Sequence, residues 1–250
     1  MATLQTAKKE LRGRLKKILS GVSNESTIAQ SSIATNNLLA LPEYQAAKHL
    51  SVYLSMPSGE ISTTAIVRDA FSRGKQVYVP YLYKPDPATT QGRSSVMEML
   101  ALRSVEDYES LQPDKWGIPT LGADTITSRK NCLGGYGIPG QPSPSSPEAE
   151  AEAEADGTGL DFIVMPGLAF DEQLRRLGHG MGYYDHFLNR LMGKEQGNGK
   201  AIIAQKPYLA ALALGEQILP PEENIPVADH DCPVDAVVVG DGRILKQPSS

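Results

Sequence analysis

The stretch HLSVYLSMPSGEISTTAIVRDAFSRGKQVYVPY (residues 49–81) decides the fold, because its hydrophobic period changes twice. Two apolar runs, HLSVYLS (49–55) and QVYVPY (76–81), are rich in residues that favour strands. Between them, STTAIVRDAFSRG (62–74) starts with N-capping residue types, has helical spacing and ends in glycine. A strand, a helix and a strand joined at this length form a parallel crossover. The stretch therefore predicts a parallel sheet covered by helices.

The same two periods continue on both sides of this unit. Towards the N-terminus, residues 4–19 predict an amphipathic helix with a very basic outer face, and a second helix begins at Ser23 or Asn24 and stops before Pro42. Further apolar runs predict strands at 96–102, 160–167, 208–214 and 235–245, the last as two strands around Asp241-Gly242, and a helix at 183–192. Together these elements predict an α/β fold, with a mostly parallel open sheet and helices on both faces.

One segment breaks this pattern. Residues 134–159, GGYGIPGQPSPSSPEAEAEAEADGTG, contain glycine and proline first and then alternating glutamate and alanine, so they offer nothing to bury. The apolar pattern resumes directly afterwards at LDFIVMPG (160–167). We therefore expect a low-complexity surface insertion within one domain that spans residues 1–250.

The composition excludes several classes of protein. A formal net charge of -5 and a pI of about 5.5 argue against a general nucleic-acid binder. The two cysteines, Cys132 and Cys232, are too few for a disulfide framework and lack metal-ligand spacing, which fits a reducing compartment. No apolar run is long enough for a membrane span, and the start, MATLQTAKKELRGRL, lacks the apolar stretch of a signal peptide. We expect a cytoplasmic protein; the basic, amphipathic start leaves a mitochondrial fraction open.

The chemistry concentrates in LGHGMGYYD (177–185), where three glycines alternate with other residues before a predicted helix. This loop follows a buried strand, and ligands of parallel sheets bind beyond the carboxyl ends of strands. A helix N-terminus there offers free backbone N–H groups to an anion. The pattern predicts a phosphate cradle, with Asp185 as an oxygen ligand for Mg²⁺. It is neither the dinucleotide fingerprint nor a P-loop, so a simple tight turn remains the alternative.

Five segments resemble the 5-formyltetrahydrofolate cyclo-ligase family in its own order. They are AKKELR (7–12), YLSMPSGEI (53–61), WGIPTL (116–121), MPGLAFDEQLRRLGHGMGYYDHFL (165–188) and IPVADHDCPVDAVV (225–238). The resemblance covers nearly the whole chain apart from the insertion. It implies a Rossmann-like fold similar to the sugar-phosphate isomerase and CoA-transferase type. It also implies that ATP and Mg²⁺ drive ring closure of 5-formyltetrahydrofolate to 5,10-methenyltetrahydrofolate, with release of ADP and phosphate.

The resemblance also implies site residues. The ATP-binding positions are Lys8, Lys9, Glu10, Leu11, Arg12, Arg176, Leu177, Gly178, His179, Gly180, Met181, Gly182, Tyr183 and Tyr184. The substrate-binding positions are Leu54, Glu60, His179, Gly180, Met181, Gly182 and Tyr183, of which His179 and Tyr183 are the catalytic candidates. The Mg²⁺ ligands are Asp185 and Asp231. Trp116, Tyr183 and Tyr184 are candidates to stack on ring faces. The implied protein is a monomer without nucleic-acid or membrane partners, and its folate carries or lacks a polyglutamate tail.

Two positions depart from the family pattern. Many members have arginine and lysine in the loop as G-R-G-K-G, whereas this chain has His179 and Met181. In addition, the segment before Glu60 is one residue longer than the usual spacing. Two other functions therefore stay open: a sugar-phosphate isomerase or CoA-transferase-like enzyme that needs no ATP, and a non-catalytic homologue that binds folate or nucleotide.

Overall fold

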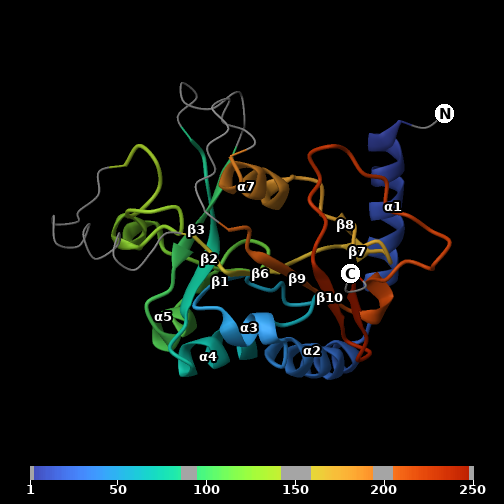
Figure 1. Cartoon of the computed structure of the whole chain (residues 1–250), viewed down its shortest axis with the longest axis horizontal. Helices are drawn as coiled ribbons and strands as arrows, with labels where there is room; N and C mark the ends of the chain where they lie inside the picture. Colours follow the sequence, from blue (N-terminus) through green and yellow to red (C-terminus); the bar gives the residue numbers. More distant parts are fainter. Residues whose placement is uncertain (1–2, 86–94, 142–158, 194–204, 248–250) are drawn as a thin grey trace.

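A seven-stranded sheet forms the centre of the protein, seen here in a computed structural model that describes residues 3–85, 95–141, 159–193 and 205–247. Its strands are β1 His49–Val52, β2 Gln76–Tyr83, β3 Val96–Ala101, β6 Phe162–Met165, β9 Tyr208–Ala213, β10 Ala236–Val239 and β11 Ile244–Lys246. They lie in the order β11-β10-β9-β6-β1-β2-β3 (Figure 1). The five inner strands are parallel, and the edge strands β3 and β11 are antiparallel to their neighbours. The predicted fold class is confirmed.

Helices cover both faces of this sheet, as predicted. α2 Asn24–Leu39, α3 Pro42–Ala46 and α4 Thr64–Ser72 lie on one face, and α7 Tyr183–Leu191 lies on the other (Figure 1). α1 Leu4–Leu19 stands at one side of the molecule. The remaining helices of the described residues are α5 Val105–Glu109 and the 3₁₀ helices η1 Ala123–Ser128 and η2 Gly215–Gln217. None of the helices in the described ranges is long and apolar enough to cross a membrane.

The central strand β6 shows why the predicted apolar runs are continuous and do not alternate. All four of its residues are buried. Phe162 and Val164 pack in the core cluster that contains α2 and α4, whereas Ile163 and Met165 pack in the cluster that contains α7. A strand of a parallel sheet with helices on both faces must be apolar on both sides. Each such side chain contributes about 1.5–3 kcal/mol when it is fully buried.

The prediction of a wholly solvated insertion is wrong at its beginning. Ile138 is buried in the core, and the backbone N–H of Gly137 donates to the carbonyl of Arg129 at 2.8 Å. The side chain of Asn131 donates to the carbonyl of Gly137 at 2.9 Å. The glycines therefore turn the chain back onto residues 129–131, which allows one apolar side chain to reach the core. Residues 142–158 lie outside the described ranges, so the surface position of the remainder and the single-domain organisation stay predictions.

The stretch between β6 and α7, predicted as a loop, contains a short antiparallel pair. Its strands are β7 Ala169–Phe170 and β8 Arg176–Leu177. The buried carboxylate of Asp171 closes the turn, because it accepts the backbone N–H groups of Gln173 at 3.1 Å and Arg175 at 3.0 Å. Leu174 adopts a φ of 61° in this turn. A single buried aspartate thus fixes the direction in which the glycine loop leaves β8.

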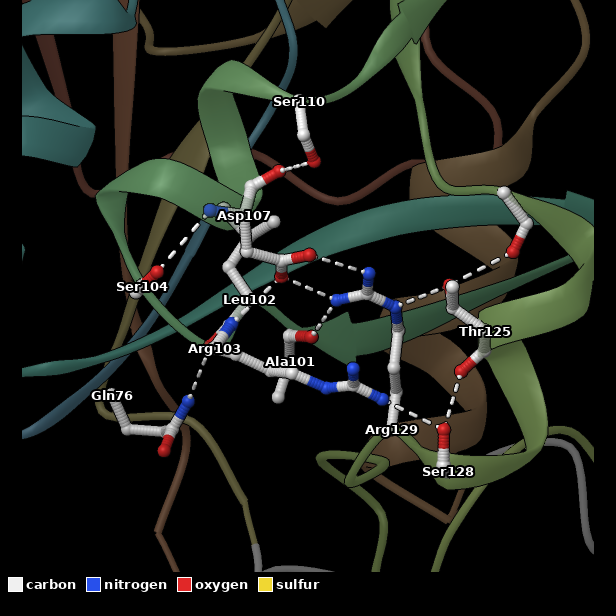
Figure 2. Close-up of polar contacts among 11 residues, drawn as sticks. Gln76, Ala101, Leu102, Arg103, Ser104, Asp107, Ser110, Thr125, Ser128 and Arg129 are labelled. Carbon is white, nitrogen blue, oxygen red and sulfur yellow. Dashed lines mark hydrogen bonds and ion pairs between the residues drawn. The ribbon is translucent and has the colours of Figure 1, made fainter.

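An ion pair between Arg129 and Asp107 joins the two flanks of a second short hairpin (Figure 2). The hairpin strands are β4 Gln112–Pro113, which follows α5, and β5 Pro119–Thr120, which precedes η1. Arg129, after η1, donates to both carboxylate oxygens of Asp107 in α5 at 2.6 and 2.8 Å, and to the carbonyl of Ala101 at 2.9 Å. The hydrogen bonds from Arg129 hold the pKa of Asp107 below its usual value. The two ends of the hairpin are therefore tied to each other and to β3.

Candidate active site

The glycine loop presents bare backbone at the start of α7. Gly182 is the N-cap of α7 in the left-handed conformation, with a φ of 69°, and no side chain caps the helix. Gly180 has a φ of 109°, and a Cβ atom there would lie 3.4 Å from the guanidinium carbon of Arg12. Both positions therefore favour glycine on conformational grounds. The uncapped first turn of α7 retains backbone N–H groups and a partial positive charge for an anion.

The basic face of α1 lies against this loop. The Nε of Arg12 donates to the carbonyl of Gly178 at 2.9 Å, and Lys8, one turn earlier, forms an ion pair with Asp231. The structure therefore places Arg12 on the loop and Lys8 on Asp231, one of the predicted metal ligands. Lys9 and Glu10 lie on the exposed side of the helix, so their side chains point away from the loop. Leu11 packs against the core, which anchors the helix.

The two predicted metal ligands come from distant segments and lie close together. The Oδ2 of Asp185 lies 2.8 Å from a guanidinium nitrogen of Arg176, and its Oδ1 accepts the backbone N–H of Cys232 at 3.1 Å. Asp231 is the preceding residue, and its carboxylate accepts the N–H of Ala228 at 2.7 Å. Burial favours the protonated form of Asp231, but hydrogen bonds from Lys8 and Ala228 outweigh it and lower the pKa.

This donor set fits a Mg²⁺ ion that arrives with phosphates. Across the described ranges, no group of three or more His, Cys, Asp or Glu residues could hold a metal by itself. Mg²⁺ typically binds one or two carboxylates, substrate phosphates and several waters. Asp185 and Asp231 supply two carboxylates of the right chemistry, beside a loop suited to phosphates. The pair therefore fits a nucleotide-bound metal better than a fully protein-ligated one.

A cavity of about 440 Å³ adjoins the loop. It is lined by Leu54, Glu60, His179, Tyr183, Tyr184 and Trp116 of the predicted residues, and by Tyr53, Met56, Pro80, Leu82, Met97, Asp114, Ile118, Pro119, Thr120 and Pro166. Its mouth is apolar, because Trp116 is 65% exposed and Leu82 is 45% exposed. The volume suits a small organic ligand. His179 and Tyr183 belong to both the cavity and the loop, so the two predicted binding regions are continuous.

Glu60 is the acidic group at the buried end of this cavity. The side chain is buried, and one oxygen accepts the N–H of Met56 at 3.0 Å. Burial raises the pKa of Glu60 to about 7, although the Met56 hydrogen bond opposes the shift. The pKa of Tyr184 is also raised, first by burial and then by the charge of Glu60. The Tyr184 hydroxyl is buried and has no hydrogen-bond partner in the part of the chain that the structure describes. The cavity thus offers an acceptor and a hydroxyl to a polar ring edge.

His179 lies at the junction of loop and cavity. Its pKa is lowered, first by burial and then by the positive charges of Lys16, Arg176 and Arg12. Tyr183, on the same rim, shares a 2.6 Å hydrogen bond with the hydroxyl of Ser95. Met181 is 62% exposed and does not line the cavity. The residue that replaces the family's lysine therefore points away from the cavity.

Sequence reasoning missed most of the cavity wall. Met56, Met97 and Pro166 are apolar, and nothing in their pattern separates them from core residues. The wall formed by residues 114–120 depends on the β4–β5 hairpin, which the hydrophobic pattern did not reveal. One local signal was present: the carboxylate of Asp114 accepts the N–H groups of Trp116 at 2.8 Å and Ile118 at 3.0 Å, as aspartates often do in turns.

Comparisons with known proteins identify the family of this chain. The model of the 5-formyltetrahydrofolate cyclo-ligase family matches residues 4–240. The 5-formyltetrahydrofolate cyclo-ligase of Mus musculus is 34% identical over 239 residues, which cover 96% of this chain and 96% of that protein. The probable 5-formyltetrahydrofolate cyclo-ligase of Schizosaccharomyces pombe is 31% identical, covering 92% of this chain and 94% of its own length. A solved structure, the 5,10-methenyltetrahydrofolate synthetase of Aquifex aeolicus, shares the fold with a TM-score of 0.60 at 23% identity, covering 97% and 94% of the two chains.

Proposed function

Because the chain belongs to the 5-formyltetrahydrofolate cyclo-ligase family, which forms 5,10-methenyltetrahydrofolate, we propose that it drives this ring closure with ATP and Mg²⁺. ADP and phosphate are the other products. One observation carries the proposal: the cavity that holds Leu54 and Glu60 shares His179 and Tyr183 with the glycine loop. A folate in the cavity and a nucleotide on the loop would therefore meet at these two residues.

The proposed chemistry explains why the site is rich in cations and poor in nucleophiles. A formamide carbon is a weak electrophile, so the γ-phosphoryl group first moves from ATP to the formyl oxygen, and ADP leaves. N10 then attacks the formyl carbon, and the C–O bond breaks with release of phosphate. Phosphoryl transfer depends mainly on positioning and on stabilisation of negative charge. Lys8, Arg12 and Arg176 supply positive charge, and the uncapped start of α7 supplies backbone donors.

The folate is oriented by the walls of the cavity in this proposal. Glu60 accepts hydrogen bonds from the N–H edge of the pterin, and Leu54 covers a ring face. His179 and Tyr183 lie next to the formyl group and exclude water from it. Asp185 and Asp231 would hold a Mg²⁺ ion, which would supply positive charge to neutralise the phosphates.

The decisive experiment is a direct assay. Incubation of the protein with 5-formyltetrahydrofolate and MgATP should produce the absorbance of the conjugated methenyl product. Omission of ATP should abolish it, which separates this enzyme from a sugar-phosphate isomerase or CoA-transferase-like enzyme. Binding of both ligands without turnover would identify a non-catalytic homologue, and would reject the proposal.

Binding of 5-formyltetrahydrofolate should weaken as the pH falls below about 7, where Glu60 becomes protonated. The N–H edge of the pterin binds the ionised carboxylate. The affinity of the protein for 5-formyltetrahydrofolate should therefore fall about tenfold for each pH unit below the pKa of Glu60. Glu60→Gln should bind about ten- to a hundredfold more weakly at pH 8 and lose this pH dependence. Dissociation constants measured by calorimetry from pH 5.5 to 8.5 test both points. Glu223→Gln, at an exposed carboxylate, is the control; equal pH profiles for Glu60→Gln and the wild type would contradict the assignment.

Met181→Lys should strengthen nucleotide binding. The substitution restores a cation to the loop at an exposed position, where steric cost is small. An exposed charge near phosphates should tighten MgATP binding about three- to tenfold. Titration with MgATP at two salt concentrations measures the effect, and Met181→Gln controls for the change in side-chain shape. If both nucleotide affinity and turnover stayed at the wild-type level, the loop would not lack a useful cation.

We propose the cytoplasm as the location and a monomer without nucleic-acid or membrane partners as the active form. Cys132 and Cys232 are buried and form no disulfide, which supports a reducing compartment. A polyglutamate tail on the folate would leave the cavity through its apolar mouth.

A further inference from the structure

Each of the two proposed metal ligands is already neutralised by a cation from the proposed nucleotide site. Lys8 is paired with Asp231, and the two side chains are only 13% and 16% exposed. Arg176 lies 2.8 Å from Asp185. Two carboxylates and two cations sum to zero, so the site has little net attraction for a free divalent ion.

We propose that Lys8 determines which form of the metal this site accepts: its ammonium group holds the place of the metal ion in the free protein and excludes Mg²⁺ that arrives without a nucleotide. The inference rests on the proposed function of Asp185 and Asp231. When a triphosphate binds, its negative charges draw Lys8 away from Asp231, and the carboxylate becomes available to the metal. Lys8 then binds phosphate.

The surroundings of the pair allow Lys8 to leave while Asp231 stays. The Asp231 carboxylate keeps the N–H of Ala228 at 2.7 Å, so it has a second anchor. Lys8 lies in the N-terminal half of α1, whereas the buried residues of the helix, Leu15 and Leu19, lie further along it. A lysine side chain has four flexible carbons and a single charged end with three donors, so it changes partners readily.

The position of Arg12 shows where the Lys8 side chain would move when it leaves Asp231. Arg12 lies on the same face of α1 and already donates to Gly178 in the glycine loop. A phosphate bound on the loop would thus be within the reach of the helix that carries Lys8. The exchange couples the two ligands: nucleotide binding improves metal binding, and by thermodynamic reciprocity the metal improves nucleotide binding.

The test measures Mn²⁺ and nucleotide affinities separately. Mn²⁺ prefers the same oxygen ligands as Mg²⁺ and is followed by electron paramagnetic resonance. Without nucleotide, Lys8→Met should bind Mn²⁺ about tenfold more tightly than the wild type, because a competing cation is removed. The same variant should bind MgATP about tenfold more weakly, because a phosphate ligand is lost. A purely structural role for Lys8 predicts that both affinities fall.

Lys17→Met is the matched control, since Lys17 is an exposed lysine on the same helix. It should leave both affinities close to those of the wild type. Lys8→Gln serves as a second variant, and it should also bind Mn²⁺ more tightly and MgATP more weakly than the wild type. An unchanged or weaker Mn²⁺ affinity in both Lys8 variants, or tight nucleotide-free Mn²⁺ binding by the wild type, overturns the inference. Failure of the wild type to bind MgATP would instead reject the proposed function.

Discussion

Arg176→Gln should lower kcat/KM for the proposed ATP-dependent ring closure by about 100- to 1,000-fold, which is the usual effect of losing one group that stabilises charge in a transition state. The Arg176 side chain is only 4% exposed and lies between the loop and the proposed metal site. It holds Asp185 at 2.8 Å, and its guanidinium carbon lies 5.9 Å from the ring centre of Tyr184. One substitution would therefore remove a proposed phosphate-binding charge and release a proposed metal ligand. Steady-state kinetics with varied MgATP measure the loss.

The neighbouring arginine provides the control. Arg175 lies 2.7 Å from the buried carboxylate of Asp171 and also contacts Gln173 and Asn224, away from the glycine loop. Arg175→Gln should therefore reduce stability but change kcat/KM much less than Arg176→Gln does. Similar kinetic losses in both variants would indicate that the turn, and not the charge of Arg176, supports the reaction.

Arg129→Met should lower the free energy of unfolding by about 3–5 kcal/mol, because it leaves the Asp107 carboxylate without its buried partner. Arg129 is 3% exposed and also supports the carbonyl of Ala101 (Figure 2). Urea denaturation measures this loss of stability, provided that the dependence of the free energy of unfolding on urea concentration is unchanged. The KM for 5-formyltetrahydrofolate should rise as well, since the ends of the hairpin that carries Trp116 are no longer joined.

Low pH should lower the folding stability of the wild type through the same Arg129–Asp107 ion pair. The pKa of Asp107 is lowered mainly by Arg129, so the stabilisation is present above the usual pKa of aspartate and is lost as the pH falls through the lowered pKa. Arg129→Met should show less of this acid dependence. Arg68→Met, at the exposed Arg68–Glu109 pair, should cost less than about 1 kcal/mol. A comparable loss in Arg68→Met would contradict the importance of burial.

The sequence predicted the elements whose physical signal is repeated along many residues. Strands such as β6 are continuous apolar runs, and α1 and α2 show clear caps and spacing, so their bounds were found closely. The hairpins β4–β5 and β7–β8 have strands of two residues, too short for any period to appear. Their turns depend on Asp114 and Asp171, whose role is visible only when the backbone N–H groups they accept are known.

The site residues also divide into those that a local sequence pattern reveals and those that only the folded structure reveals. The glycine loop and the start of α7 were predictable from local pattern, because bare backbone before a helix has a direct chemical meaning. The approach of Asp231 to Asp185 joins segments far apart in the chain, and only the family resemblance linked these two residues. The ion pair between Lys8 and Asp231 was not predicted. The raised pKa of Glu60 depends on its burial, which no spacing in the sequence reveals.

The attachment of the low-complexity segment also has an evolutionary consequence. Its two described flanks are fastened to one short stretch, since Gly137 donates to the carbonyl of Arg129 and Gly159 donates to the carbonyl of Cys132. The described residues on either side of 142–158 are thus fastened at neighbouring points of the fold. Because the entropy of closing a loop grows only slowly with its length, descendants of this gene can gain or lose residues here with little penalty to folding. Repeat expansion in this segment would be nearly neutral, which makes it a place where lineages are free to diverge.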